Sequence, residues 1–148
     1  LVRSALEGES VKRFMKTDPV TVSGDTTVDH LVEDFIYKYH YRMFPVINDS
    51  RPLSCVSIND VKSIPREEWD HHTVRELARP CSTDNTISMD EDAIKALTVM
   101  NKTGSSRLMV VDHGGKLIGV VAMRDLMRFL TLKLDLDEGV VNKTEKED

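Results

Sequence analysis

Apolar and polar positions alternate along this chain in a pattern that occurs twice. In each copy a short extended stretch, Val20–Val22 or Thr86–Ser88, comes before a segment whose apolar residues recur every three or four positions. That spacing predicts amphipathic helices over Val28–Tyr37 and Ala93–Asn101. An aspartate, Asp25 or Asp90, precedes each predicted helix, and we expect its carboxylate to cap the helix N-terminus.

Two apolar, β-branched-rich runs follow each predicted helix and indicate a hairpin. The expected strands are Met43–Ile47 with Leu53–Ile58, and Leu108–Val111 with Leu117–Met123. Asn, Asp, Ser and Gly residues between the runs favour tight turns. A closing helix is expected from Asp60, where Pro65 stops it, and from Asp125 to about Leu134.

The two copies are internal repeats with an offset of about 65 residues, as Asp25 with Asp90 and Asp60 with Asp125 illustrate. In the same comparison Arg42 corresponds to Arg107. A unit of about 50 residues buries too little surface to be stable alone, so we expect the two halves to pack together. A cleft between related halves is a common place for a small ligand.

The fold class predicted from this order is α+β, with small sheets packed against helix pairs and a pseudo-twofold axis between the halves. The expected organisation is an N-terminal segment over 1–10, a first domain over 11–66, a connector over 67–73, a second domain over 74–134 and an acidic, disordered tail over 135–148.

Composition narrows the function. The 148 residues carry a formal net charge of −5, which argues against a general nucleic-acid binder. Cys55 and Cys81 form neither a metal-binding nor a redox motif, and a chain with so few cysteines fits a reducing, cytoplasmic compartment. No apolar run is long enough for membrane insertion. The first residue is Leu, so we expect a segment cut from a longer protein.

The repeated order of elements resembles the CBS domain, and its duplication resembles a Bateman module, a pair of packed CBS domains. The resemblance covers Val11 to about Leu130. It rests on Phe44-Pro45-Val46 and Cys55-Val56-Ser57-Ile58-Asn59-Asp60 in the first copy, and on Leu108–Asp112 and Gly119–Asp125 in the second.

A narrower resemblance concerns Leu1–Met15, Ile64–Trp69 and Arg128-Phe129-Leu130. These segments look like CBS pairs attached to site-2-type membrane metalloproteases, where the pair follows the last transmembrane helix on the cytoplasmic side. The protease motif H-E-x-x-H does not occur here. The resemblance therefore implies that any catalytic portion lies upstream of this segment.

The resemblance to CBS pairs also implies a ligand, an adenine nucleotide such as AMP, ADP or ATP, with no cofactor required. It assigns the ribose hydroxyls to Asp60 or Asp125, and a helix N-terminus offers N–H groups to phosphate. The alternative is that both aspartates only cap helices. Ser57, three residues before Asp60, matches the family's phosphate-binding hydroxyl, whereas Ala122 does not. The sequence therefore ranks Asp60 with Ser57 above Asp125.

The remaining site residues are also assigned by the resemblance. Arg107 matches a basic position near the phosphates, Arg42 lies one residue out of place, and Arg124 adds positive charge. Adenine is expected against the extended stretches and their neighbours, namely Val20, Thr21, Val22, Pro45, Thr86 and Ile87. Taken singly, each basic residue is better explained as a solvated surface charge than as a ligand contact, and the apolar residues are better explained as ordinary core.

The function expected from the sequence is therefore a non-catalytic regulatory module that binds an adenosine-containing small molecule, forms a homodimer and regulates an attached protein. The alternative is a dimerisation or docking scaffold that needs no ligand.

Overall fold

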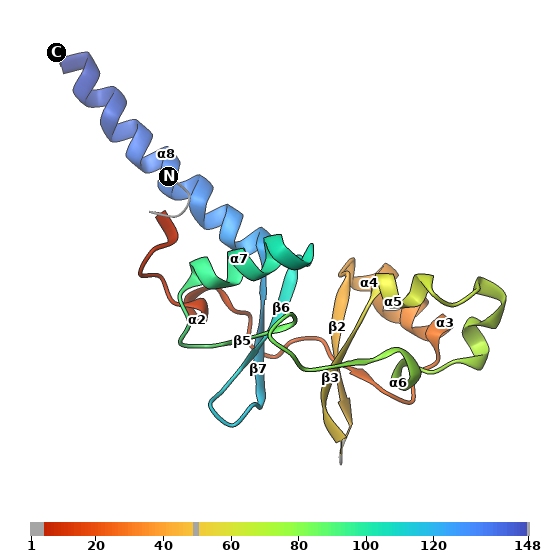
Figure 1. The fold of residues 1–148 in the computed structure, drawn as a ribbon. Coiled ribbons are helices and arrows are strands. Elements are labelled where there is room, and N and C mark those ends of the chain that lie inside the picture. The colour runs from red at the N-terminus through yellow and green to blue at the C-terminus, as the bar shows by residue number, and fades with distance from the viewer. Residues whose placement is uncertain (1–4, 49–50, 148) are drawn as a thin grey trace.

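The computed structural model describes residues 5–48 and 51–147. They form two α+β halves that lie side by side, each built on its own small sheet (Figure 1). The fold class predicted from the sequence is confirmed. Part of the first expected turn, Asp49 and Ser50, lies outside the described residues.

The elements follow one another in the same order in both halves. The first half contains β1 (Val22–Ser23), α3 (Val28–Leu31), the π-helical turn η1 (Val32–Ile36), α4 (Tyr37–Tyr39), β2 (Met43–Asn48), β3 (Arg51–Ser57) and α5 (Ile58–Lys62). After the 3₁₀ helix η2 (Arg66–His71), the second half contains β5 (Thr86–Ser88), α7 (Ala93–Thr103), β6 (Arg107–Val111), β7 (Leu117–Ala122) and α8 (Met123–Glu147).

Each sheet contains a central antiparallel hairpin with one strand added parallel to it. In the first sheet β1 runs parallel to β2 and β2 antiparallel to β3, while in the second β5 runs parallel to β6 and β6 antiparallel to β7. The hairpin registers correspond, since Met43 faces Ser57 and Arg107 faces Ala122. The repeat seen in the sequence is therefore a repeat of topology.

The segment that opens each repeat packs on the other half. Helix α2 (Val11–Phe14) places Val11 and Phe14 in the hydrophobic core of the second half (Figure 1). Helix α6 (Val74–Leu77) places Val74 in the core of the first half. This exchange, which the sequence boundaries do not reveal, interlocks the halves and buries apolar surface that neither half covers alone.

The same exchange continues in the backbone. Strand β4 (Arg79–Pro80), in the opening segment of the second repeat, pairs with β3 of the first sheet. Lys16, which precedes β1, forms the corresponding bridge to Val120 of β7, with reciprocal N–H···O=C bonds of 2.9 and 3.0 Å. Each sheet is therefore completed by backbone from the opening of the other repeat.

The prediction that Asp25 and Asp90 cap helices is wrong. The N-cap residues are Thr27 for α3 and Asp92 for α7, each two residues later. The Asp92 carboxylate accepts hydrogen bonds from Ile94 N and Gly8 N, both at 2.9 Å, and so also holds the N-terminal segment. Asp25 instead forms an ion pair with Arg75 at 2.7 Å.

The first repeat helix is not the regular helix expected over Val28–Tyr37. It begins as α3, widens into the π-helical turn η1 and ends with α4, and His40 then takes a left-handed conformation with φ 62°. Helix α7 is regular and ends at Gly104, also left-handed at φ 72°. An inserted π turn leaves the hydrophobic spacing nearly intact, so the pattern does not reveal it.

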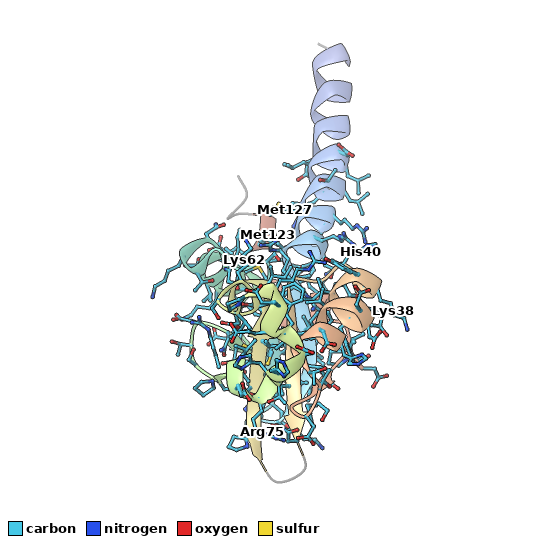
Figure 2. The ribbon with its side chains drawn as sticks, turned by 90° about the vertical axis from the view of Figure 1, so that its right-hand side faces the viewer. Lys38, His40, Lys62, Arg75, Met123 and Met127 are labelled. Carbon is cyan, nitrogen blue, oxygen red and sulfur yellow. The ribbon has the colours of Figure 1, made fainter. Side chains whose placement is uncertain are left out.

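The last helix also differs from expectation. Helix α8 was expected to end near Leu134 before a disordered tail, but it runs on to Glu147. It projects away from the rest of the molecule (Figure 1), and Met123 and Met127 lie near its base (Figure 2). Within residues 5–48 and 51–147, no helix combines the length and the apolar character that a bilayer-spanning segment needs.

Candidate ligand-binding clefts

Two clefts lie where the halves meet. The larger cleft has a volume of about 620 Å³ and is bordered by Ser57 and Asp60 of the first half and by Lys102 and Arg107 of the second. The smaller cleft has a volume of about 290 Å³ and places Arg124 and Asp125 of the second half opposite Tyr41 and Arg42 of the first. The expectation of clefts lined by both repeats therefore matches the structure.

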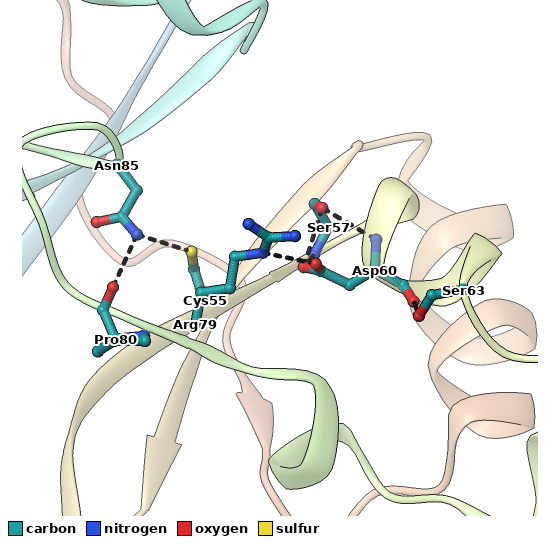
Figure 3. A network of polar contacts seen from close by, with 7 residues as sticks. All are labelled: Cys55, Ser57, Asp60, Ser63, Arg79, Pro80 and Asn85. Atoms are coloured by element: carbon teal, nitrogen blue, oxygen red, sulfur yellow. Dashed lines mark hydrogen bonds and ion pairs between the residues drawn. The ribbon is translucent and has the colours of Figure 1, made fainter.

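In the larger cleft, Ser57 and Asp60 are hydrogen-bonded to each other (Figure 3). Ser57 is the N-cap of α5, and Asp60 is the third residue of that helix rather than its first. Asp60 Oδ2 accepts hydrogen bonds from the Ser57 backbone N–H at 2.9 Å and from Ser57 Oγ at 3.0 Å, while Asp60 N donates back to Ser57 Oγ at 3.4 Å. This is a capping box, and it uses the hydroxyl expected to meet phosphate.

Asp60 has a further partner in Arg79 of β4. Arg79 Nε donates to Asp60 Oδ1 at 2.7 Å, and this hydrogen bond raises the pKa of Arg79 (Figure 3). The Asp60 side chain is only 5% exposed, whereas that of Arg79 is 70% exposed. Both carboxylate oxygens therefore already accept hydrogen bonds from the protein. A ribose hydroxyl would have to share Asp60 Oδ1 with Arg79.

The smaller cleft is arranged differently around its aspartate. Asp125 is half-buried, and no ion pair among the described residues involves its carboxylate. Four cations border the same cleft, contributed by both halves: Lys16, Arg42, Arg107 and Arg124. Since the chain as a whole is acidic, this concentration of positive charge makes the cleft a local site for an anion.

Lys16 and Arg79 occupy corresponding positions in the two clefts. Arg79 pairs with Cys55 of β3, and Lys16 bridges to Val120 of β7. Cys55 and Val120 each lie five residues before the aspartate of their half. The arginine fork reaches Asp60, whereas the exposed Lys16 makes no ion pair with Asp125 among the described residues. The two pseudo-symmetric sites therefore differ in whether their carboxylate is free.

Arg107 borders both clefts. Its guanidinium carbon lies 3.9 Å from the centre of the Tyr41 ring, and its Nη1 donates to the carbonyl oxygen of Met43. Burial lowers the pKa of Arg107 below its usual value. Because the register pairs Arg107 with Ala122 and Met43 with Ser57, the counterpart of Arg107 is Met43. The predicted correspondence of Arg42 with Arg107 is therefore wrong.

The other predicted adenine contacts lie elsewhere. Thr86 and Ile87 border a third cavity of about 530 Å³ between β5 and α7, which adjoins the larger cleft through Asp84 and Lys102. Val20, Thr21, Val22 and Pro45 border neither cleft, and Val22 and Pro45 are buried. The strand itself covers Val22–Ser23 rather than Val20–Val22, and Val22 belongs to the core of the first half.

Sequence reasoning missed the cations that come from the opening segments. Lys16 and Arg79 each follow the short opening helix of their repeat, in Met15-Lys16 and Ala78-Arg79. That repeated position was a usable signal. Its spatial role could not be read from the sequence, because each opening segment pairs with the other half. Lys102, which borders the larger cleft from the end of α7, had no such signal.

The chemistry of these clefts is that of binding. The described residues contain no group of three or more His, Cys, Asp or Glu side chains able to hold a metal ion. Each cleft combines carboxylates with cations at the junction of the two halves, so that hydrogen-bond acceptors lie beside donors: Asp60 and Asp84 in the larger cleft, and Asp125 in the smaller one. Two interlocked repeats with such junction clefts define a tandem regulatory module.

The comparison with known families identifies the class of protein to which the chain belongs. The family profile described as CBS domain matches residues 11–67 and again residues 74–132. The chain therefore belongs to the CBS domain family and carries a tandem pair of these domains, as predicted. CBS pairs are generally regulatory rather than catalytic.

Individual relatives support the same assignment. Zinc metalloprotease MJ0392 of Methanocaldococcus jannaschii is 28% identical over 138 residues, which are 93% of this chain but only 36% of that protein. The structure of CBSX2 in complex with AMP has 25% identity and a TM-score of 0.71, over 86% of this chain and 99% of that one. The CBS domain of a bacterial CNNM/CorC family Mg²⁺ transporter in complex with ATP has 20% identity and a TM-score of 0.71, over 88% of this chain and 92% of that one.

Proposed function

We propose that this CBS pair is a sensor of adenine nucleotides and binds them in the smaller cleft. The observation that carries the proposal is the grouping of Lys16, Arg42, Arg107 and Arg124 in one cleft with Asp125, in a chain of net charge −5. Like charges brought together repel, and an anionic ligand relieves that repulsion. The related CBSX2 structure contains AMP, which supports the same ligand class.

The parts of a nucleotide match different parts of this cleft. The Asp125 carboxylate is an acceptor suited to the two neighbouring hydroxyls of a ribose. The arginines present planar donor groups that suit phosphate oxygens. Val120, Ala122 and the Tyr41 ring supply the apolar wall that a purine needs. The volume of about 290 Å³ is near the lower end for small-molecule sites, which favours a nucleotide whose phosphates extend toward solvent.

This proposal reverses the ranking expected from the sequence. The sequence favours Asp60 because Ser57 supplies a hydroxyl that Ala122 lacks. In the folded chain that hydroxyl donates to Asp60 itself, and Arg79 occupies the other carboxylate oxygen. A nucleotide in the larger cleft would compete with these bonds, whereas no ion pair within the described part of the chain engages Asp125. We therefore rank Asp125 first and Asp60 second.

A titration of AMP, ADP and ATP by calorimetry and thermal shift tests the proposal. Asp125→Ala should weaken binding about tenfold or more, the effect of losing a charge-assisted hydrogen bond. Asp135→Ala, which removes an exposed carboxylate of α8, is the matched control and should bind like the wild type. Loss of binding in Asp60→Ala alone would move the site to the larger cleft. The absence of binding by all three nucleotides would refute the function.

The target of the regulation is an additional proposal. The match to a zinc metalloprotease leads us to propose that the module regulates an attached protein, such as a membrane metalloprotease, from its cytoplasmic side. The chain spans 36% of that relative's length, so the rest of such a protein would lie outside this segment. Nucleotide-dependent activity of a full-length parent, abolished by Asp125→Ala, would support this role.

A second candidate function is a scaffold that acts through dimerisation. Helix α8 carries exposed apolar side chains, Met127, Leu132, Leu134 and Leu136. Such side chains on a projecting helix favour a homodimer. Light scattering of the wild type and of Leu132→Glu with Leu136→Glu distinguishes the cases, since only a dimer built on α8 would dissociate in the variant. A wild type that stays monomeric at high micromolar concentration would exclude the homodimer.

A further inference from the structure

Arg107 lies where the two repeats contact each other through equivalent residues. It is the first residue of β6, and Met43, the first residue of β2, holds the corresponding place in the other half. Their contact, through Arg107 Nη1 and the Met43 carbonyl oxygen, is thus a contact between pseudo-equivalent residues. Such contacts occur on a pseudo-twofold axis. A strictly symmetric pair would have two arginines here, and this chain has one.

That single arginine is within reach of both clefts. Met43 borders the larger cleft, and Tyr41, whose ring the guanidinium overlies, borders the smaller cleft. A small cavity of about 70 Å³ lies between them and is bordered by Ser57, Ser106 and Arg107, which it shares with one cleft or the other. Arg107 therefore stands between two adjoining sites.

The surroundings of Arg107 also favour the binding of an anion. It is half-buried, and none of the ion pairs found over residues 5–48 and 51–147 includes it. A partly desolvated cation that is hydrogen-bonded to a carbonyl oxygen and overlies an aromatic ring, with the Asp125 carboxylate nearby, still gains from a phosphate placed beside it. A nucleotide bound in either cleft could place its phosphate beside Arg107.

We infer that Arg107 couples the two clefts, so that a nucleotide bound in one weakens the binding of a second nucleotide in the other. The inference rests on the proposed function and concerns its regulation. Arg107 Nη1 is already bonded to the Met43 carbonyl oxygen, so phosphates in both clefts would have to share the remaining N–H groups of one guanidinium and its single charge. The second ligand would therefore meet a site without its central cation and with a negative charge nearby. Because the two binding steps then have different affinities, the module responds to one nucleotide over a wide concentration range.

Calorimetric titration of ADP into the whole chain measures the coupling. In the wild type the second ADP should bind about tenfold or more weaker than the first, within the usual range of coupling between sites. Arg107→Met copies the residue of the other repeat. It should weaken the first step and bring the two constants together. Lys102→Met, which removes a cation of the larger cleft only, should weaken one step and keep the coupling.

A variant that keeps Arg107 but excludes phosphate from the smaller cleft also tests the coupling. Arg124→Glu repels phosphate from the smaller cleft, so Arg107 becomes free for the larger one. ADP should then bind the larger cleft about fivefold or more tighter than the second ADP binds to the wild type. Two equal, independent sites in the wild type, or an unchanged separation in Arg107→Met, would overturn the coupling while leaving nucleotide binding intact. No ADP binding at all would refute the proposed function as well.

Discussion

Arg107 donates a hydrogen bond across the junction of the two repeats to the carbonyl oxygen of Met43, its own counterpart. The contact shows how far the halves have diverged while keeping one topology. Where one half has arginine the other has methionine, and where one has Ser57 the other has Ala122. The differences fall on the residues that border the clefts. The two sites are consequently unequal in charge and in the freedom of their carboxylates.

The Asp60 network should contribute measurably to stability. Asp60→Ala removes a capping box and an ion pair from a buried position, and we expect the free energy of unfolding to fall by about 1–3 kcal/mol. Arg79→Ala should cost only about 1 kcal/mol or less, because the Arg79 side chain is 70% exposed and its charge is screened by solvent. Urea unfolding of both variants measures the difference. Equal effects would mean that the capping box contributes little.

The order of the elements was predictable from the sequence, and the contacts between the repeats were not. Apolar spacing and turn residues located both hairpins and both sets of helices, because these signals are local. The exchange of Val11 and Val74 between the cores depends on long-range packing and left no local trace. The capping positions of Asp25 and Asp90 failed for a related reason. Several polar residues near a helix start can cap it, and only the fold selects one.

The candidate site, like the fold, was predictable from the sequence only where its signals were local. The pair Asp60 and Asp125 was located because the repeat made their positions visible. The mutual hydrogen bonding of Ser57 and Asp60 gives Ser57 a second explanation, since a motif that suggests a phosphate-binding hydroxyl also fits a capping box. Separating the two uses required knowing where Arg79 lies, and Arg79 reaches Asp60 only through the exchanged strand β4.

Gly119 of β7 should be sensitive to a single added methyl group. A Cβ at this position would lie 2.7 Å from the carbonyl oxygen of Lys16, a backbone atom that can move only if the opening segment shifts. Gly119→Ala should therefore lower the free energy of unfolding by about 1–3 kcal/mol. It should also weaken nucleotide binding, because the shift moves Lys16 at the smaller cleft.

Gly114→Ala is the matched control for that substitution. Its Cβ would meet nothing closer than 3.5 Å, and its φ is not in the left-handed region. The free energy of unfolding should change by about 0.5 kcal/mol or less. Thermal and urea unfolding of the two variants give the comparison. Equal stability of both would show that the Lys16–Val120 bridge tolerates displacement.

The connector should carry a pH-dependent contribution to stability through His72. A 2.6 Å contact between His72 Nδ1 and Glu76 Oε2 raises the pKa of His72 above its usual 6.5. A raised pKa in the folded state means that the stabilisation is fully present below about pH 6.5 and is lost as the pH rises through the higher folded value. Glu76→Gln should remove the larger part of this contribution, and the weaker contact of His72 with Glu68 remains.

The melting temperatures of the wild type and Glu76→Gln, compared between about pH 5.5 and about pH 8.5, test this sign. The wild type should exceed the variant most at the acidic end, and the gap should close toward the alkaline end. Proton NMR of the histidine ring should show the His72 pKa move back toward 6.5 in the variant. A gap that widens as the pH rises would contradict the assigned ion pair.

The two cysteines should react at very different rates, and this difference tests the position of β3 beneath the larger cleft. Burial, together with the nearby charge of Asp60, raises the pKa of Cys55 to about 11, so at about pH 8 only about one molecule in a thousand carries the thiolate. Cys81 is exposed, although partial burial of its thiol also raises its pKa.

A maleimide at about pH 8 should therefore modify one cysteine per native chain, and Cys81→Ser should abolish the fast reaction. Unfolding in urea should release the second thiol. Fast labelling of Cys55 in native Cys81→Ser would mean that the larger cleft opens to the strand behind Asp60, and Asp60 would then be accessible to a ribose after all.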